Sequence, residues 1–251
     1  MHVHEDNAAG RPYGMDLRAP PGSRLTVRAP QRNRRAMLTP RILALVLFTA
    51  AACNFSFVGV EGSGVSASED RQVAAFQAVA LSGSFAVEVE VGPAQSVRVE
   101  ADDNIVPIVV TEVVGEVLKI SSRQNYSTRG PIKVRVTTPK LTAVEHSGSG
   151  SIEVRAIDAG LFTASLDGSG MVRLAGSADM LTANIDGSGS LEAADLATNS
   201  ATVALSGSGG AKVHARQRVV ATISGSGSVQ HAGGATDVVS NIRGSGSVSP
   251  M

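Results

Sequence analysis

Four charged residues occupy matching positions beside a repeated Gly-Ser-Gly triplet. Asp167 and Asp186 each directly precede a triplet, whereas Arg173 and Glu192 each lie five residues after the first glycine of one. Carboxylates gathered with an arginine could act as acid and base in cleaving a polysaccharide, or could face a ligand without reacting. Whether these side chains meet depends on how the repeat folds.

The triplet recurs six times, at intervals of 18 to 20 residues, until the chain ends. Apolar and polar residues alternate on both sides of it, which predicts a strand, a bend and a second strand. A fixed period with this alternation is typical of a solenoid, whose units bury their apolar faces only against neighbours. The twelve glycines of the six triplets are Gly148, Gly150, Gly168, Gly170, Gly187, Gly189, Gly207, Gly209, Gly225, Gly227, Gly244 and Gly246.

We therefore expect an all-β fold, with a β-helix or solenoid of about six coils of ~19 residues over 141–251. Adjacent coils would lie ~4.8 Å apart. Glycine suits a stacked corner because it allows unusual backbone dihedrals and close approach of backbones. We expect these glycines to be structural, and the serines between them to form a column whose hydroxyls bond to one another.

On such a fold Asp167 and Asp186 are neighbours on adjacent coils, as are Arg173 and Glu192. Two carboxylates ~4.8 Å apart repel each other unless a cation or a proton lies between them. Calcium, however, takes six to eight oxygen ligands, and the chain does not repeat an aspartate in every unit. The Arg173–Glu192 pair is also typical of a solvated ion pair worth ~0–1 kcal/mol. We treat all four as possible ligand-facing residues and expect no catalytic residue, metal or cofactor.

The histidines and serines do not form a recognisable site. His146, His214 and His231 lie at different offsets from their triplets, so they do not share a column. The serines lie in a repeated corner and not in the strained turn that a nucleophile requires. His146 occupies an aliphatic position of the first repeat, and we expect it where the core meets the preceding strands.

Charge is distributed unevenly along a chain whose formal net charge is zero. Residues 1–52 hold eight arginines and three acidic residues, which leaves 14 basic and 19 acidic residues in 53–251. Residues 53–251 are therefore mildly acidic, which gives no electrostatic reason to bind nucleic acid, and we exclude that class of partner.

The amino-terminal segment reads as an export signal. An apolar run over 42–52 follows Arg41 and ends at Cys53, the only cysteine; it is too short to span a bilayer. This pattern resembles a bacterial lipobox, so we predict a signal peptide over 37–52 and lipidation of Cys53. The alternatives are ordinary signal-peptidase cleavage after Ala52 and, through Arg34 and Arg35, twin-arginine export.

The segments that flank the signal differ in composition from it. Residues 1–36 are polar and Pro-rich, unlike an export signal. This composition indicates a non-structural leader or a start assigned too early, with Met37 or Met15 as the true start. Residues 53–70 are rich in Gly and Ser and predict a flexible tether. Asn54 after the cysteine favours the outer membrane as the destination.

Residues 71–140 predict more conventional strands, at 85–91, 96–101, 117–122 and 132–138. The segment 102–113 contains Pro107 and predicts an interrupted strand or one helical turn. We expect this part to form the first, less regular coils and to cap the stack.

The order of these motifs resembles the putative auto-transporter adhesin, head GIN domain family. The opening "RQVAAFQAVALSGSFAVEVEVG" (71–92), the alternating strands and the serial "GSGS" coils carry the resemblance, which extends from Arg71 to Val248. It implies a right-handed β-helix-like fold on a secreted or envelope-anchored bacterial protein. It brings no catalytic or ligand-binding residues.

The sequence thus favours a non-enzymatic lipoprotein of the cell envelope that serves in adhesion, binding or structure. A surface polysaccharide or an envelope protein is the expected partner, besides the membrane. The alternative is a polysaccharide-processing β-helix enzyme. Because Pro250 cannot donate to a β ladder, we expect the carboxyl end to resist fibre growth but to allow a homodimer.

Overall fold

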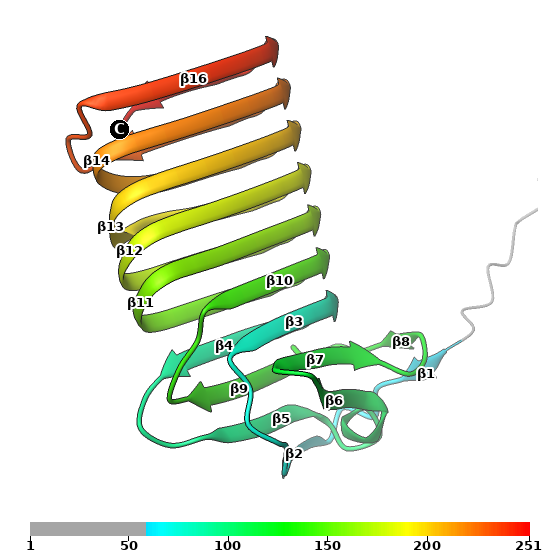
Figure 1. The fold of residues 1–251 in the computed structure, drawn as a ribbon. Coiled ribbons are helices and arrows are strands. Elements are labelled where there is room, and N and C mark those ends of the chain that lie inside the picture. The colour runs from blue at the N-terminus through cyan, green and yellow to red at the C-terminus, as the bar shows by residue number, and fades with distance from the viewer. Residues whose placement is uncertain (1–58) are drawn as a thin grey trace, which may run out of the picture. The chain divides into compact units, whose positions relative to one another are not determined.

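The computed structural model describes residues 59–251, which form an all-β structure (Figure 1). The predicted leader, the signal peptide and Cys53 lie outside the described residues. Within residues 59–251 there is no α-helix, and no helix is long and apolar enough to span a bilayer.

Parallel strands stacked in register form a β-solenoid, as predicted (Figure 1). Each long strand runs along one wall, curves round and returns along the other wall to a sharp corner. The six predicted corners bound about five complete turns, where we expected about six coils. The strands are β10 (Ala143–Gly148), β11 (Ser151–Gly168), β12 (Met171–Gly187), β13 (Ser190–Gly207), β14 (Gly210–Gly225), β15 (Ser228–Ala232), β16 (Asp237–Gly244) and β17 (Ser247–Pro250).

The Gly-Ser-Gly corners stack in one file, and the first glycine of each has a positive φ and lies against the backbone of the preceding corner, where a side chain does not fit. Gly207 has a φ of 117°, and a β-carbon on it would collide with the carbonyl oxygen of Gly187. Backbone amides hold the file together; the N–H of Ser169, for example, donates to the oxygen of Gly148 at 3.0 Å. The prediction that the corner serines bond to one another through their hydroxyls is wrong. No hydroxyl–hydroxyl hydrogen bond joins two corner serines among the described residues.

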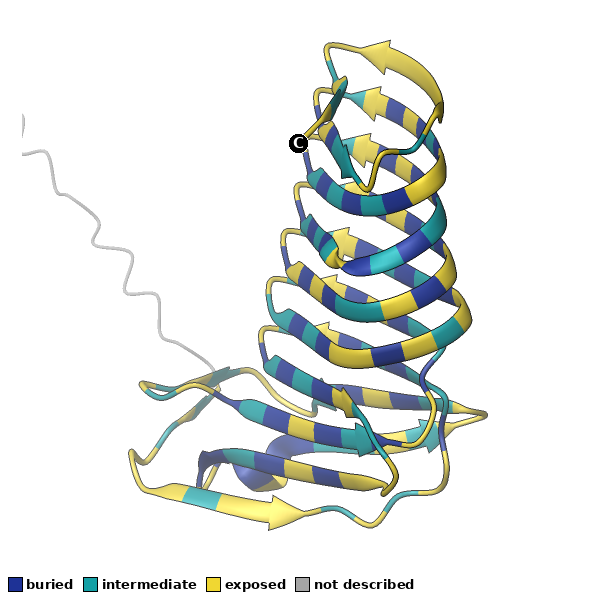
Figure 2. Ribbon diagram, turned by 90° about the vertical axis from the view of Figure 1, so that its left-hand side faces the viewer, coloured by how far each residue is buried: buried dark blue, intermediate teal, exposed yellow. Residues whose placement is uncertain are grey.

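Apolar side chains from both walls fill the interior in columns. Buried and exposed residues alternate along each strand, so each wall has one inner and one outer face (Figure 2). One such column contains Leu166, Ile185, Leu205 and Ile223, all at most 4% exposed. His146, at 3% exposed, occupies the same column as register partner of Leu166, as its aliphatic position predicted.

The stack begins earlier than the regular triplets, at a seventh corner in "SGSF" (82–85). Strands β3 (Ala78–Gly83) and β4 (Ala86–Val91) pair in parallel with β10 and β11, and Gly83 is the register partner of Gly148. Phe85 stands where later corners have their second glycine, and its ring stacks on Tyr126 with centroids 5.6 Å apart. Burial raises the pKa of the Tyr126 phenol.

An insertion between this corner and the next closes the amino-terminal end. Its strands agree with the predicted ones: β5 (Ser96–Asp102), β6 (Val109–Val114), β7 (Val117–Ser122) and β9 (Lys133–Thr138). A single 3₁₀ turn, η1 (Val106–Ile108), contains Pro107 and precedes β6, as expected for the interrupted strand. β5 and β6 pair antiparallel to β9 and β7, which ends the parallel stacking.

Part of the predicted tether is folded. Strand β1 (Val60–Glu61) pairs with β8 (Tyr126–Ser127), and β2 (Ser66–Asp70) pairs antiparallel with β5. The Gly- and Ser-rich composition suggested flexibility, but these strands are held by backbone hydrogen bonds, which do not depend on side-chain type. The ordered domain therefore starts before Arg71.

Candidate functional site

The corners divide the four charged candidates between two opposite walls. Asp167 and Asp186 precede their corners and lie on the wall that we call the groove wall: β3, β7, β10 and the halves of β11–β14 before each corner. Arg173 and Glu192 follow their corners and lie on the other wall, with β4 and β9. The buried interior separates the two pairs, so the four side chains do not form one site.

The outer face of the groove wall carries a shallow hollow of about 900 Å³ across its strands. Mostly small side chains line this hollow in two rows that run along the stack. The hollow is therefore a long, open groove that could hold an extended ligand. The row beside the corners is Ser82, Ser147, Asp167, Asp186, Ser206 and Ser224; the next row is Ala80, Glu145, Ser165, Asn184, Ala204 and Thr222.

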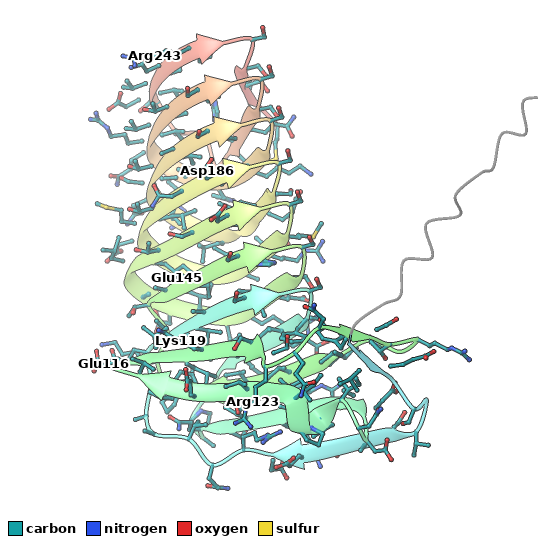
Figure 3. The ribbon with its side chains drawn as sticks, turned by 90° about the vertical axis from the view of Figure 1, so that its right-hand side faces the viewer. Glu116, Lys119, Arg123, Glu145, Asp186 and Arg243 are labelled. Atoms are coloured by element: carbon teal, nitrogen blue, oxygen red, sulfur yellow. The ribbon has the colours of Figure 1, made fainter. Side chains whose placement is uncertain are left out.

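Carboxylates dominate the charge of this groove. Asp167 and Asp186 are exact register partners, as predicted, and neither forms an ion pair with a described residue. Glu145 lies further down the wall, and Lys119 lies at the base of the groove (Figure 3). Glu112, the register partner of Lys119, also lines the groove. The groove therefore offers exposed carboxylate acceptors with a single lysine among its lining residues.

The groove lining can form many weak hydrogen bonds. Hydroxyls of Ser and Thr both donate and accept, whereas ionised carboxylates only accept. Among the described residues that line the groove there is no Phe, Tyr or Trp. Among residues 59–251, no three His, Cys, Asp or Glu side chains come together as a metal-binding group.

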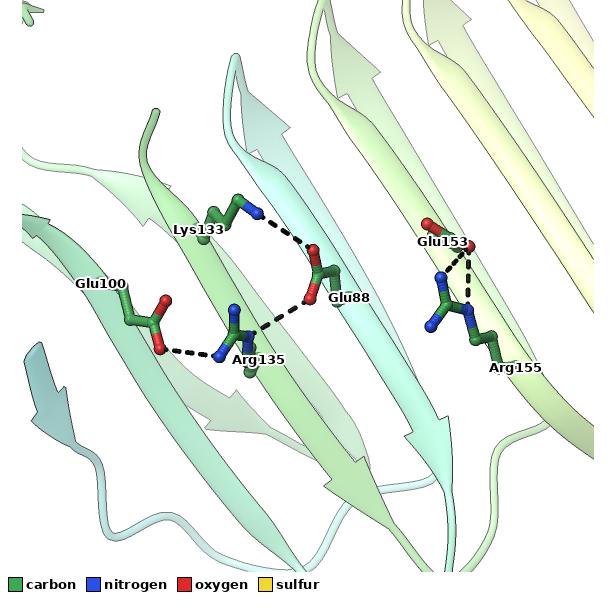
Figure 4. A network of polar contacts seen from close by, with 6 residues as sticks. All are labelled: Glu88, Glu100, Lys133, Arg135, Glu153 and Arg155. Atoms are coloured by element: carbon green, nitrogen blue, oxygen red, sulfur yellow. Dashed lines mark hydrogen bonds and ion pairs between the residues drawn. The ribbon is translucent and has the colours of Figure 1, made fainter. Parts of the chain in front are cut away.

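The opposite wall carries a ladder of ion pairs (Figure 4). Glu88 contacts Lys133 at 3.5 Å and Arg135 at 3.3 Å, and Arg135 also contacts Glu100 at 3.1 Å. Burial by itself would raise the pKa of Glu88, but the charges and hydrogen bonds of Lys133 and Arg135 outweigh burial and lower it. These pairs join neighbouring strands across the outer surface.

Arg173 and Glu192 lie on the same wall as this ladder, and only Glu192 forms an ion pair with a described residue. They are register partners, as predicted, yet the ion pair of Glu192 is with Lys212, on the following strand, at 3.2 Å. Further down, the Arg155 guanidinium donates to Glu153 at 2.7 Å, and this hydrogen bond and the Glu153 charge raise the pKa of Arg155. This surface has the features of a solvated, charge-paired sheet face.

Sequence reasoning overlooked part of the groove. Glu145 stands three residues before its corner glycine, at the same offset as Ser165 and Asn184, so the repeat alignment could have revealed it. Glu112 and Lys119 come from the insertion, outside the repeat, and no alignment on glycines could have placed them beside it.

Residues 75–235 match the profile of the family described as "Putative auto-transporter adhesin, head GIN domain". No curated protein matches the chain.

The fold is similar to that of several solved bacterial proteins. A putative adhesin from Bacteroides fragilis aligns over 77% of this chain and 100% of its own, with a TM-score of 0.63 and 20% identity. A putative lipid binding protein from Parabacteroides distasonis aligns over 76% and 99% (TM-score 0.52, 22% identity). A putative adhesin from the same species aligns over 76% and 99% (TM-score 0.51, 23% identity). At these identities the likeness concerns the fold alone.

Proposed function

Because the chain belongs to the putative auto-transporter adhesin, head GIN domain family, we propose that it is a non-enzymatic binding module of the cell envelope. Its ligand is an extended, hydroxyl-rich polymer, in the first place a surface polysaccharide, which lies along the groove wall. The observation that carries this proposal is the long groove whose rows of hydroxyls and carboxylates repeat from strand to strand.

The groove chemistry supports such a ligand. Sugar hydroxyls can donate to Asp167, Asp186 and Glu145 and can exchange hydrogen bonds with the serine row. Exposed carboxylates disfavour an acidic polymer, so the proposal favours neutral or amine-bearing chains. The open floor, without an enclosed pocket, favours weak contacts that add up along the polymer over one tightly held unit.

The anchor is the second part of the proposal. Cys53 is lipidated and holds the domain at a membrane, with the outer membrane favoured. Only residues 53–58 of the predicted tether lie before the described domain, so the domain stays close to the membrane surface.

Binding is tested with the exported protein carrying Cys53→Ser, so that no detergent is needed. The protein is titrated with neutral, amine-bearing and acidic envelope polysaccharides. We expect binding to the first two, weakened by Asp167→Asn combined with Asp186→Asn. The matched control is Glu192→Gln, a carboxylate on the opposite wall, which should leave the affinity unchanged. Equal loss in both variants, or no binding by any polymer, would remove the groove as the ligand site.

The same samples test the enzymatic alternative and the anchor. Release of sugar fragments that stops in the Asp167→Asn and Asp186→Asn variants would establish a polysaccharide-processing enzyme instead. For the anchor, wild-type protein should pellet with membranes in high salt, and the Cys53→Ser protein should not. Pelleting of both would contradict lipid attachment at Cys53.

A further inference from the structure

The carboxyl-terminal end of the solenoid is uncovered. Strand β16 pairs with β14 on one side only, and β17 pairs only with β15. Val238 and Ile242 continue two interior columns but are 40% and 39% exposed. Their register partners in β14, Val219 and Ile223, are fully buried. The core thus ends in an open apolar layer.

The two ends of the stack differ in this respect. At the amino-terminal end the antiparallel strands β2, β5 and β6 interrupt the parallel stacking, and Ile105 and Val106 are buried there. At the other end β16 presents an eight-residue edge, Asp237–Gly244, without a lysine or a proline. An exposed edge of this kind is a template for pairing with another strand.

The sequence of β16 is complementary to itself when two copies run antiparallel. With Ser240 opposite Ser240 of a second copy, Val238 lies opposite Ile242 and Asp237 lies opposite Arg243. Side chains alternate in direction along a strand, so the apolar pair falls on the inner face and the charged pair on the outer face. Sliding the register by two residues in either direction loses the charged pair.

We propose that two copies of this chain pair end to end through antiparallel β16 strands, in the register that centres on Ser240. The apolar columns then continue from one copy into the other. Arg243, which forms no ion pair with any described residue, gains a carboxylate partner. Asp237 already contacts Arg218 at 2.9 Å, so the new pair extends an existing charged row.

The assembly closes at two copies. The interface is isologous, since the same strand contributes from both sides, so its pairing edge is fully used once two copies have joined. On the other wall Pro250 has no N–H to donate, which limits further strand addition there. A two-fold axis perpendicular to the groove wall places both grooves on the same side. The dimer itself does not depend on what the grooves bind.

A disulfide trap tests both the dimer and its register. The chain with Cys53→Ser has no other cysteine, and Ser240→Cys places the new thiol opposite its own copy. We expect a disulfide-linked dimer under mild oxidation. Val238→Cys is the matched control on the same strand and face; its two thiols lie four positions apart in this register and should not link. Linking through Val238 but not Ser240 would overturn the register.

A charge reversal provides an independent measurement. By sedimentation, the Cys53→Ser protein should change from monomer to dimer as its concentration rises. Arg243→Asp should raise the dissociation constant about tenfold, since two charge pairs become repulsive. Asp237→Arg combined with Arg243→Asp exchanges the charges across the interface, and Arg218→Asp is added because Arg218 contacts Asp237 within each copy. This triple variant should restore dimerisation. A monomer at every concentration, or no restoration in the folded triple variant, would refute the proposed interface.

Discussion

The imidazole of His146 lies directly against the backbone of Gly170, on the next coil, and a β-carbon at position 170 would collide with its Nε2 atom. Neither ring nitrogen has a hydrogen-bond partner among the described residues. The register partners of His146 on either side are Leu81 and Leu166. A polar side chain without a partner thus interrupts an aliphatic column.

Replacing this histidine should stabilise the protein. His146→Leu removes two buried polar atoms and matches the adjacent leucines, so the free energy of unfolding should rise by about 1–3 kcal/mol. Chemical denaturation of both proteins measures the difference. The reciprocal change, Leu166→His, should destabilise by a similar amount. A less stable His146→Leu protein would mean that the imidazole has a favourable role in the core.

The corner glycines should not tolerate a methyl group. Gly207→Ala combines a φ of 117° with a contact to the Gly187 carbonyl oxygen, and we expect it to lower the free energy of unfolding by at least about 2 kcal/mol. Gly160→Ala is the control, because a β-carbon there meets its first neighbouring atom only at 4.0 Å. Thermal unfolding of the two variants separates a specific corner requirement from a general effect of losing glycine.

Asp186 should affect stability and binding in opposite directions. Like charges directly opposite each other on neighbouring strands destabilise a sheet, so Asp186→Asn should raise the free energy of unfolding by about 0.2–1 kcal/mol. The same change should weaken polysaccharide binding, since an acceptor is lost from the groove. Denaturation and titration on one preparation give both values. Unchanged binding with increased stability would leave Asp186 without a role in the groove.

Glu88 should make the protein slightly sensitive to acid. Its pKa in the folded state is lower than the ordinary value of 4.5, so its contribution to stability is present above that pH. The contribution is lost as the pH falls further, through the folded-state pKa. The carboxylate is 44% exposed, so the effect should stay within about 1 kcal/mol and shrink in high salt. Stability curves of wild type and Glu88→Gln should therefore differ above pH 5 and converge in acid.

The part of the chain before the triplets, residues 59–140, shows where prediction from the sequence was partial. Alternation identified the strands over 85–91, 96–101, 117–122 and 132–138, because a half-buried strand alternates whatever its partner is. It could not place Lys119 beside the groove or pair β2 with β5, since those contacts join segments far apart in the chain. β1 and β2 are held by backbone hydrogen bonds to the edges of β8 and β5, and such pairing cannot be recognised from side-chain composition.

The four charged candidate residues were also predicted only in part. Equal offsets from the glycines predicted that Asp167 neighbours Asp186 and that Arg173 neighbours Glu192, and both pairs are in register. The offsets did not reveal that the two pairs lie on opposite walls, because a bend in the sequence does not state how sharply the chain turns back.

The sequence alone determined the repeating strand, the glycine corner and the in-register stacking, because these depend on local dihedrals and on a period that each unit imposes on the next. Only the tertiary structure decided which outer face is hollowed, that the stack begins at Gly83, and that one end is closed while β16 is left open. Those features depend on contacts between segments that are far apart in the sequence, and the packing of the whole chain decides which of these contacts form.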